Sequence, residues 1–547
     1  MAPESDLSAA DAEWWRGAVI YQVYPRSFND ANGDGVGDLQ GVLEKLDYIA
    51  SVGVDGLWLS PFFTSPMKDF GYDVSNYRDV DPLFGTLADF DAVVAKAHAL
   101  GLKLIVDQVW AHTSDQHPWF VESSSSRDNP KADWYVWADA KPDGTPPNNW
   151  LATFGGPSWS WSPRRRQYYL HNFLVEQPQL NFWNADVQDA ILEVARFWLD
   201  RGVDGFRLDV INFIVHDRML TDNPVAPYSR PPALPTQFQR HVHDRSQPRA
   251  LEFLGRLRTV MDGYGARMTV GEVVENPPLE RQEEYVVGAH RLHTAYSFYF
   301  LEATAATPAL FAQALMAWSA EDGWPSWSLG NHDVARFATR LASDGDPAHV
   351  RVLLAVLLCL RGSIFLYQGE ELGLPQAKVP FERLRDPFDI AAWPAGAGRD
   401  GARTPMPWTS EPPGGGFSTS AETWLPIDAA HLPLAVAMQE GDLQSTLAFT
   451  RRLIALRASL PALRLGAATV LDAPTGVLAF ERTLGAERLL CVFELAGCGA
   501  ELPLDMRAQP LFLASGGEVL AHGGLSLPPY GAAVLGIAEA GRTHPRA

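Results

Sequence analysis

The stretch Gly205–Val210, Gly-Phe-Arg-Leu-Asp-Val (GFRLDV), decides the fold prediction, because it is a short apolar run that ends in charged side chains. Such a run fits a strand buried on both faces of a parallel sheet. Seven further strand-like runs occur, and helical stretches alternate with them: Ala18–Tyr24, Gly56–Ser60, Leu102–Asp107, Met268–Glu272, His293–Phe300, Ser326–Gly330 and Ser363–Tyr367. Eight such units predict an α/β fold, a closed (β/α)8 barrel.

The segments between these runs predict the helices and the domain organisation. Amphipathic stretches at Leu39–Val52, Thr86–Leu100 and Val187–Arg201 fit barrel helices. About 70 residues separate the third run from the helix at 187–201, and connections of that length are functional loops or small domains. We therefore expect a barrel over 1–112 and 183–455, interrupted after strand 3 by an inserted domain over 113–182. Short apolar runs with Gly/Pro turns predict a C-terminal antiparallel β-sandwich over 456–547.

Composition excludes several classes of protein. Lys and Arg number 44 against 65 Asp and Glu, which gives a net charge of −21. So acidic a chain is a poor binder of nucleic acid or of an anionic membrane surface. Three cysteines are too few for a disulfide framework. The N-terminal segment does not resemble a secretory signal, and the longest apolar run, Val352–Leu360, is far shorter than the roughly 20 residues of a membrane span. We expect a cytoplasmic protein.

Acidic side chains stand at the ends of several predicted strands, where barrel enzymes carry their catalytic residues. Arg207 and Asp209 lie two apart on a strand and face the same way, so the arginine should favour the ionised carboxylate. Glu272 follows an apolar stretch, and partial burial should raise its pKa. Two carboxylates with separated pKa values are typical of glycoside hydrolysis, and Asp333 could bind sugar hydroxyls. The alternative is a purely structural network of charges.

Five motifs in this order resemble the signature regions of the α-amylase superfamily, glycoside hydrolase family 13. They are DQVWAH (107–112), QPQLN (177–181), GFRLDV (205–210), GEV (271–273) and GNHD (330–333). More narrowly, WWRGAVIYQVYPRSF, QPQLN, YQGEELG (367–373) and RDGARTPMPW (399–408) resemble bacterial α-glucosidases and oligo-1,6-glucosidases. The resemblance covers essentially the whole chain.

The resemblance implies a role for each matching residue. Asp209 is expected to be the nucleophile that forms a covalent glucosyl enzyme, Glu272 the acid/base, and Asp333 the residue that stabilises the transition state. Arg207 is expected to hold Asp209 ionised. His112 and His332 are implied to bind the same glucose. Asp69 is expected to bind its non-reducing end, and Tyr72 to stack beneath its ring. Arg403 is expected to pair with Asp69, in competition with Arg399, and Phe154 and Phe173 to form a wall of the pocket.

A second pattern, Asp30-Ala-Asn32-Gly-Asp34-Gly-Val36-Gly-Asp38, carries oxygen ligands at alternate positions, which suits Ca2+ or Mg2+. An EF-hand is excluded, because its twelfth position is Gly41 and the preceding segment reads as a strand. The pattern resembles the first-loop metal site of the oligo-1,6-glucosidase group, with the side chains of Asp30, Asn32, Asp34 and Asp38 and the carbonyl of Val36 as ligands. We expect a structural ion there, against the alternative of an Asx-rich turn without metal. No cofactor is expected for the chemistry, because no GxGxxG or P-loop pattern follows a strand.

Two positions depart from the family pattern. Ala111 replaces the Asn that holds a calcium ion between barrel and inserted domain in α-amylases, so that calcium is not expected. Val210, after the predicted nucleophile, accompanies α-1,6 action in related enzymes, whereas the proline-rich segment Asn223–Phe238, either a stiff lid or a disordered loop, resembles that of transglucosylating relatives that prefer disaccharides.

The prediction is an exo-acting retaining α-glucosidase that cleaves short, maltose-like substrates, weakly favours α-1,4 linkages, and transfers glucose to alcohols or sugars. It would work as a monomer or homodimer. The alternatives are an oligo-1,6-glucosidase, a sucrose hydrolase or isomerase, and, from another class, a non-catalytic barrel scaffold.

Overall fold

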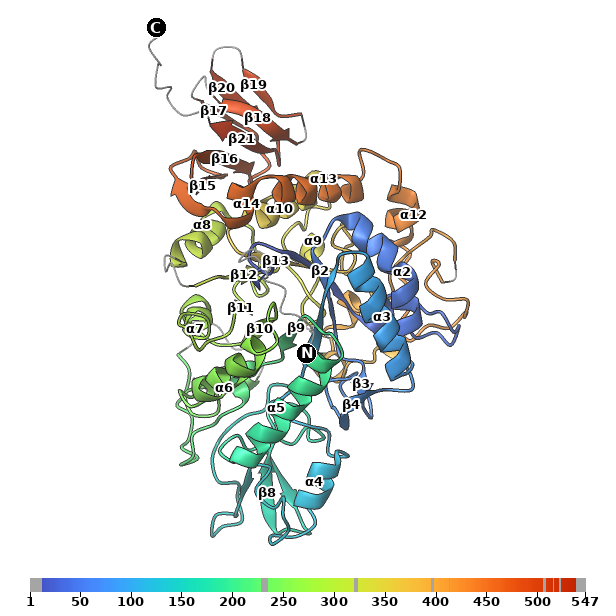
Figure 1. Cartoon of the computed structure of the whole chain (residues 1–547), viewed down its shortest axis with the longest axis vertical. Coiled ribbons are helices and arrows are strands. Elements are labelled where there is room, and N and C mark those ends of the chain that lie inside the picture. Colours follow the sequence, from blue (N-terminus) through green and yellow to red (C-terminus); the bar gives the residue numbers. More distant parts are fainter. Residues whose placement is uncertain are drawn as a thin grey trace.

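The computed structural model describes residues 12–227, 235–318, 323–394, 398–412, 414–504, 508–514, 516–520 and 523–537. Figure 1 shows a barrel in the middle of an elongated molecule, with a small sheet at one end and two antiparallel sheets at the other. The predicted fold class, a (β/α)8 barrel with an insertion after the third barrel strand and a C-terminal β-sandwich, is confirmed.

The barrel consists of eight strands in the order β11-β10-β9-β5-β2-β1-β13-β12, and every pair of neighbours is parallel. A parallel bridge between Ala295 and Pro325 joins β11 to the start of β12, which closes the ring. The strands are β1 (Val19–Val23), β2 (Gly56–Leu59), β5 (Lys103–Gln108), β9 (Gly205–Leu208), β10 (Met268–Val273), β11 (Thr294–Ser297), β12 (Ser326–Trp327) and β13 (Ser363–Tyr367).

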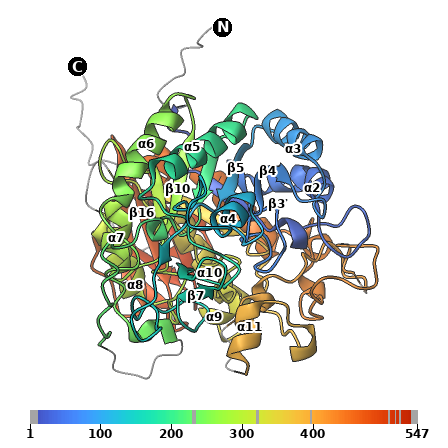
Figure 2. The same ribbon diagram turned by 90° about the horizontal axis from the view of Figure 1, so that it is seen from below.

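Helices surround this ring, as the view from below in Figure 2 shows. The longer ones are α2 (Leu39–Val52), α3 (Leu87–Ala99), α5 (Ala185–Asp200), α6 (Ala250–Asp262), α7 (Pro278–Glu284), α8 (Pro308–Ala317), α10 (Pro347–Cys359) and α13 (Thr446–Ser459). Their starts are fixed by local chemistry. Thr86 caps α3, and its side chain and that of Asp89 form a reciprocal capping box. Asp38 caps α2 by accepting from the Gly41 N–H at 2.6 Å.

The barrel interior is filled with side chains. Trp58, Ile105, Met268 and Phe365 belong to one buried cluster, and each is at most 2 % exposed. The interior of such a barrel is therefore a packed core and not a pore. Any substrate must therefore bind at a mouth of the barrel, and barrels of this kind bind their substrates at the end where the strands finish.

Two predicted strands are shorter than expected. The run 293–300 gives β11 only to Ser297, because 298–300 turn away from the sheet. The run 326–330 gives β12 only to Trp327. In both places the chain leaves the sheet before the polar residues that follow, and this frees those residues to line the barrel mouth.

The insertion carries helix α4 (Pro118–Ser123) and the antiparallel sheet β6-β8-β7, formed by β6 (Trp137–Ala138), β7 (Trp159–Ser162) and β8 (Gln167–Leu170). Its aromatic side chains, among them Trp150 and Trp159, pack on one another with Leu170. These elements lie within the predicted insertion, 113–182. A separate short hairpin, β3 (Phe63–Thr64) with β4 (Asn76–Val80), follows the second barrel strand.

The C-terminal part contains two antiparallel sheets, β14-β15-β16-β21-β18 and β17-β20-β19. Its first strand begins at Ala467, after α13 and α14 (Pro461–Leu465), and α13 packs against α10 and α2 of the barrel. The boundary predicted at 455/456 therefore falls inside a continuous helix. The strands are β14 (Ala467–Leu471), β15 (Val477–Leu484), β16 (Glu487–Glu494), β17 (Ala500–Pro503), β18 (Ala508–Leu513), β19 (Glu518–Leu520), β20 (Gly524–Leu527) and β21 (Ala532–Ile537).

The proline-rich segment predicted at 223–238 is described at its two ends, while 228–234 lie outside the described residues. Asn223 and Asn149 of the insertion exchange hydrogen bonds at 2.8 and 2.9 Å, and Gln239 donates to the Asn149 carbonyl at 2.6 Å. The described ends of the segment are thus fastened to the inserted domain. Short helices α9 (Phe337–Arg340), α11 (Pro387–Ala392) and α12 (Val436–Gln439) complete the described elements of regular helix.

Candidate active site

A cavity of about 950 Å3 opens at the carboxyl end of the barrel strands. Asp209, Glu272 and Asp333, three acids far apart in the sequence, all line it. They follow or end β9, β10 and β12, so the barrel brings them to one mouth. The three acids thus lie at one mouth of the barrel, as expected from their positions at strand ends.

Arg207 is the centre of this group of acids and is fully buried. Its Nη1 donates to Asp209 Oδ1 at 2.7 Å and to Asp107 Oδ1 at 2.8 Å, and its Nη2 donates to Glu272 Oε2 at 2.6 Å. The hydroxyl of Tyr296 accepts from Nε and Nη2. One guanidinium therefore holds the Asp209 and Glu272 carboxylates beside each other.

Backbone conformation at the site adds a second link between the two acids. Val210 has a φ of +33°, a left-handed conformation that a β-branched residue rarely adopts. Its N–H donates to Glu272 Oε2 at 3.1 Å. Strain of this kind gathers at functional sites, where the surrounding structure enforces it.

The pKa values of the two acids are shifted upward. Burial raises the pKa of Glu272 to about 8, although the attraction of Arg207 opposes the shift. Burial likewise raises the pKa of Asp209 to about 7, again against Arg207. The expectation that the arginine would lower the pKa of Asp209 is wrong in net direction, because desolvation of the charged form outweighs the ion pair here. The expected order, with Glu272 above Asp209, is retained.

Asp333 is electrostatically different from the other two acids. Its carboxylate accepts from Arg403 Nη2 at 2.9 Å and from Arg399 Nη1 at 3.3 Å. The His332 ring lies 3.1 Å from its second oxygen. Burial alone would raise its pKa, but these three neighbours hold the pKa of Asp333 well below its usual range. Asp333 is thus an anion throughout the neutral range.

The pairing of Asp69 corrects the sequence prediction. Arg399, not Arg403, donates to Asp69, with Nη2 at 2.8 Å from Oδ1. Arg403 instead binds Asp333 and donates through Nε to the His332 carbonyl at 2.7 Å. The two arginines are four residues apart around a single 3-10 turn, so their separate destinations depend on tertiary packing. Together they tie the Asp69 and Asp333 carboxylates into one buried network.

Asp386, which the sequence analysis missed, anchors Arg399. It is fully buried and accepts from Arg399 Nε at 2.9 Å and from Nη2 at 2.7 Å. It also caps α11 by accepting from the Phe388 N–H at 3.2 Å. Its only sequence signal is an acid immediately before a proline-started helix, which is the ordinary pattern of a helix cap.

Tyr72 and His112 line the cavity, and the second predicted histidine, His332, is buried against Tyr72. The rings of Tyr72 and His332 stack with centroids 5.3 Å apart, and the Tyr72 hydroxyl lies 2.6 Å from His332 Nε2. The Nε2 of His112 lies 3.0 Å from the Tyr72 carbonyl. Burial lowers the pKa of His112 to about 4, so it is a neutral hydrogen-bonding group.

A wall of aromatic rings in contact with one another runs along one side of the cavity. Phe173 lies 5.2 Å from the ring of His112, 5.6 Å from Phe154 and 5.6 Å from Phe213. Phe154 in turn contacts Phe388 of α11 at 5.7 Å. The structure brings together the predicted pair Phe154 and Phe173, and adds Phe213 and Phe388, which had no distinguishing motif in the sequence.

The loop predicted to hold a metal ion is closed by its own hydrogen bonds. Asp30 accepts from the N–H groups of Gly33 and Gly35 at 2.7 Å each. Asp38 accepts from Ala31, Asn32 and Gly41. Carboxylate oxygens have further lone pairs, so the donor chemistry suits a hard cation. Within the described residues, however, no group of three or more His, Cys, Asp or Glu side chains is arranged to hold an ion.

None of the helices in the described part of the chain is long and apolar enough to cross a membrane.

The model of a known protein family, the catalytic domain of α-amylase, matches residues 22–466. This chain belongs to the α-amylase family. The match runs from the end of β1 through the rest of the barrel, its insertion and the helix α13, and places the chain among glycoside hydrolases. Arg207, Asp209, Glu272 and Asp333 lie inside the matched part of this α-amylase family member.

Two named relatives are similar to this chain over most of its length. A protein of Rhizobium meliloti (strain 1021) named probable alpha-glucosidase is 52% identical over 546 residues, which covers 96% of this chain and 98% of the relative. The oligo-1,6-glucosidase of Parageobacillus thermoglucosidasius is 35% identical over 514 residues, 88% of this chain and 90% of the relative.

Solved structures agree with this placement. The alpha-glucosyl transfer enzyme XgtA superposes with a TM-score of 0.92 and 50% identity, covering 96% of this chain and 99% of the other. The trehalulose synthase MutB from Pseudomonas mesoacidophila MX-45 superposes with a TM-score of 0.87 and 32% identity, covering 96% and 99%.

Proposed function

We propose that the protein is an exo-acting, retaining α-glucosidase that removes the terminal glucose of short α-glucosides and passes it to water, an alcohol or a sugar. The observation that carries this proposal is the sharing of Arg207 by Asp209 and Glu272, whose carboxylates bond to adjacent nitrogens of one guanidinium. Carboxyl groups held this closely suit the retaining mechanism, in which no water fits between them in the first step.

The first step forms a covalent intermediate. A carboxylate oxygen of Asp209 attacks the anomeric carbon of the bound glucose, and the bond from that carbon to the leaving oxygen breaks. Glu272, which the buried environment keeps protonated, gives its proton to the leaving oxygen. Asp333, held ionised by its cationic neighbours, stabilises the positive charge that develops on the sugar.

The second step releases the glucose. The hydroxyl oxygen of water, an alcohol or a sugar attacks the same carbon, and its proton moves to the Glu272 carboxylate. The bond to Asp209 breaks and its electron pair returns to the Asp209 carboxylate. Two inversions restore the original α configuration of the product.

Exo-action is supported by the closed deep end of the cavity. A buried chain of ion pairs closes this end, formed by Asp69, Arg399 and Asp386. A sugar chain that continued past the first glucose would have to displace these charges, which is strongly unfavourable in a buried site. The names of the most similar relatives, an α-glucosidase and a glucosyl transfer enzyme, support the same activity.

A second candidate, an oligo-1,6-glucosidase, is favoured by Val210 and by the relative that bears that name. A third candidate, a sucrose hydrolase or isomerase, is supported by a solved relative, an isomaltulose synthase from Erwinia rhapontici NX5 in complex with its natural substrate sucrose. Initial rates on maltose, isomaltose, sucrose and trehalose separate these possibilities. We expect maltose to be the best of the four, with the α anomer of glucose as the first product by NMR. Release of the β anomer first would contradict retention.

We also propose that the loop from Asp30 to Asp38 binds a structural Ca2+ or Mg2+ ion through Asp30, Asn32, Asp34, Asp38 and the Val36 carbonyl. Its support is the oxygen-rich sequence, and no catalytic step passes through it. A cytoplasmic location is proposed as well, supported by the free thiols of Cys359, Cys491 and Cys498. A monomer or a homodimer remains the prediction for the oligomeric state.

A further inference from the structure

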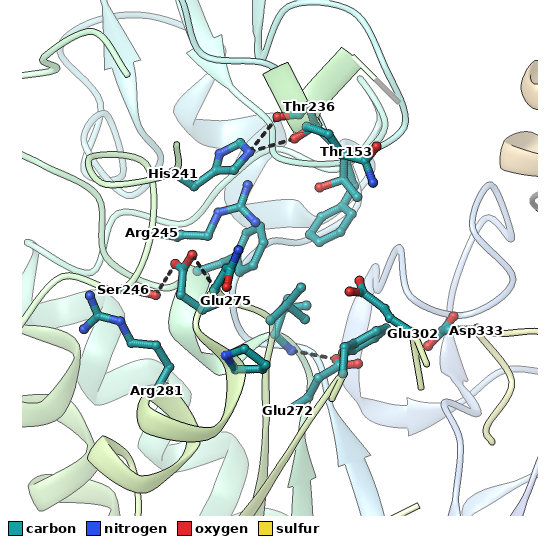
Figure 3. Close-up of a pocket in the computed structure, with 18 of the residues that line it drawn as sticks. Thr153, Thr236, His241, Arg245, Ser246, Glu272, Glu275, Arg281, Glu302 and Asp333 are labelled. Carbon is teal, nitrogen blue, oxygen red and sulfur yellow. Dashed lines mark hydrogen bonds between the residues drawn. The ribbon is translucent and has the colours of Figure 1, made fainter. Parts of the chain in front are cut away.

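The side of the cavity that would hold the leaving group is lined by polar side chains. Because Asp69 and Arg399 close one end, the group released by cleavage lies on the other side of Glu272. That side is lined by the segment 236–246, which follows β9, by 274–281, which follow β10, and by Glu302, which follows β11. We call these residues the acceptor wall. Figure 3 shows its side chains from several loops around one opening.

Three ionisable side chains of the acceptor wall, His241, Glu275 and Arg281, are already partnered within the protein. His241 lies 2.6 Å from Asp244 and 3.0 Å from the Thr236 hydroxyl. Arg281 donates to Glu284 at 2.6 Å, and Glu275 accepts from Ser246 at 2.8 Å. Such groups shape the wall, because a ligand would have to replace bonds that they already make.

Arg245 is different. Its guanidinium carbon lies 4.1 Å above the ring of Phe213, and Nη2 makes a long contact of 3.3 Å with Asp244. The residue is only 7% exposed, its Nε is buried without a hydrogen-bond partner, and within the described residues Nη1 also has none. A buried guanidinium with unused N–H groups loses the hydration that it would have in water. A ligand in the cavity that accepts hydrogen bonds would restore part of that loss.

Glu302 supplies the complementary chemistry from another loop. It is exposed, it lines the cavity, and its carboxylate has no hydrogen-bond or ion-pair partner among the described residues. Figure 3 shows it on the side of Asp333, across the opening from Arg245. Within the acceptor wall, Arg245 thus offers donors and Glu302 an acceptor. The ring of Phe213 contacts both Phe173 of the aromatic wall and Arg245.

We propose that Arg245 and Glu302 bind the hydroxyl groups of a sugar in the leaving-group and acceptor position, so that the enzyme selects polyhydroxylated acceptors over simple alcohols. A sugar hydroxyl both accepts and donates, so it satisfies a guanidinium and a carboxylate together. An alcohol with one hydroxyl, which must face the anomeric carbon, has none left for either. This inference rests on the proposed glucosidase activity.

The test compares two donors that differ in the leaving group only. Maltose releases a hexose, whereas p-nitrophenyl α-glucoside releases an aryl group without free hydroxyls. Arg245→Met keeps an apolar stem over Phe213 and removes the donors, and Glu302→Gln keeps the shape and removes the charge. We expect each variant to lower kcat/KM for maltose about tenfold or more and for the aryl glucoside less than about threefold.

Arg249→Met is the matched control. Arg249 also stacks over an aromatic ring, Trp183 at 4.9 Å, and also pairs with an acid, Glu252 at 3.3 Å, but it does not line the cavity. It should leave both rates unchanged. With the aryl glucoside as donor, transfer to added glucose should fall in Arg245→Met, while transfer to methanol should not.

Equal losses on both donors, or no loss on maltose, would overturn the assignment of Arg245 and Glu302. An unaltered ratio of transfer to glucose and to methanol would do the same. If the wild-type protein released no p-nitrophenol, the glucosidase proposal itself would fail, and this outcome is distinct from the other two.

Discussion

The two ends of the cavity are built differently. At the deep end, Asp69, Asp333, Asp386, Arg399 and Arg403 bond to one another in a buried network that comes from four segments of the chain. At the acceptor wall, Arg245 makes one long ion pair with Asp244 and has an unpartnered Nε, and Glu302 has no hydrogen-bond or ion-pair partner among the described residues. A site whose carboxylates are each held by a guanidinium tolerates few changes of ligand, whereas a site with an unpartnered carboxylate can accept several. The comparison indicates strict recognition of the transferred glucose and a tunable choice of acceptor.

The largest expected effect is that of replacing Asp209, where the deep end and the acceptor wall meet. Asp209→Asn should lower kcat by about 10^4-fold or more, because the amide is a poor nucleophile and no covalent intermediate forms. The thermal midpoint and circular dichroism should stay close to wild type, since the amide still accepts from Arg207. Near-normal turnover by a purified, sequence-verified Asp209→Asn protein would refute the nucleophile assignment.

The next largest effect tests the deep end. Asp386→Ala removes the partner that orients Arg399, and small displacements of positioning groups reduce turnover by about 10^2-fold. Maltose and the aryl glucoside should suffer alike, because both place a glucose at the deep end. Asp389→Asn, also on α11, is the control, since Asp389 accepts from the Asp400 N–H and does not hydrogen-bond Arg399. A loss confined to maltose would assign Asp386 to the acceptor side instead.

The pH dependence of kcat/KM is expected to show a smaller effect than these two substitutions. Catalysis needs Asp209 ionised and Glu272 protonated, so kcat/KM should rise as pH passes the pKa of about 7 and fall above about 8. These apparent values belong to the coupled group around Arg207 and not to isolated residues. In Glu272→Gln, assayed with an aryl glucoside that needs no protonation to leave, the alkaline fall should disappear. Its persistence would point to another acid.

The smallest expected effect concerns the loop from Asp30 to Asp38, whose residues do not line the cavity. If a divalent ion binds there, chelation should lower the thermal midpoint by about 1–3 °C, and added Ca2+ or Mg2+ should restore it. The rate at 25 °C should not change. Asp34→Ala should be insensitive to chelator. Wild-type protein that contains no metal by elemental analysis after purification with Ca2+ would contradict the ion.

The fold and the three acids could be predicted because their signals are local. Each barrel strand is a short apolar run. Asp209 follows such a run directly, Glu272 lies at the end of one, and Asp333 lies in the segment after another, so a barrel alone brings them together. The partner of Asp69 could not be predicted, because Arg399 and Arg403 are four residues apart and only the packing of the 386–403 segment decides between them.

Other features of the site could not be predicted from the sequence for the same reason. Phe213, Arg245 and Asp386 lie in connecting segments without periodicity, and their places depend on how those segments cross the barrel mouth. The net rise in the pKa of Asp209 required knowledge of its complete burial, which the neighbouring Arg207 alone does not reveal. In each case a long-range contact, absent from the local sequence, decides the outcome.

The most direct test of the account is to trap the glucosyl enzyme. Incubation with 5-fluoro-α-glucosyl fluoride slows release of the intermediate, and peptide mass spectrometry then locates the attached sugar. The account predicts one fluoroglucosyl group per chain, on Asp209 within the peptide that contains GFRLDV, and no label in Asp209→Asn. A label on Glu272, or an unlabelled enzyme that nevertheless hydrolyses the reagent with inversion, would contradict it.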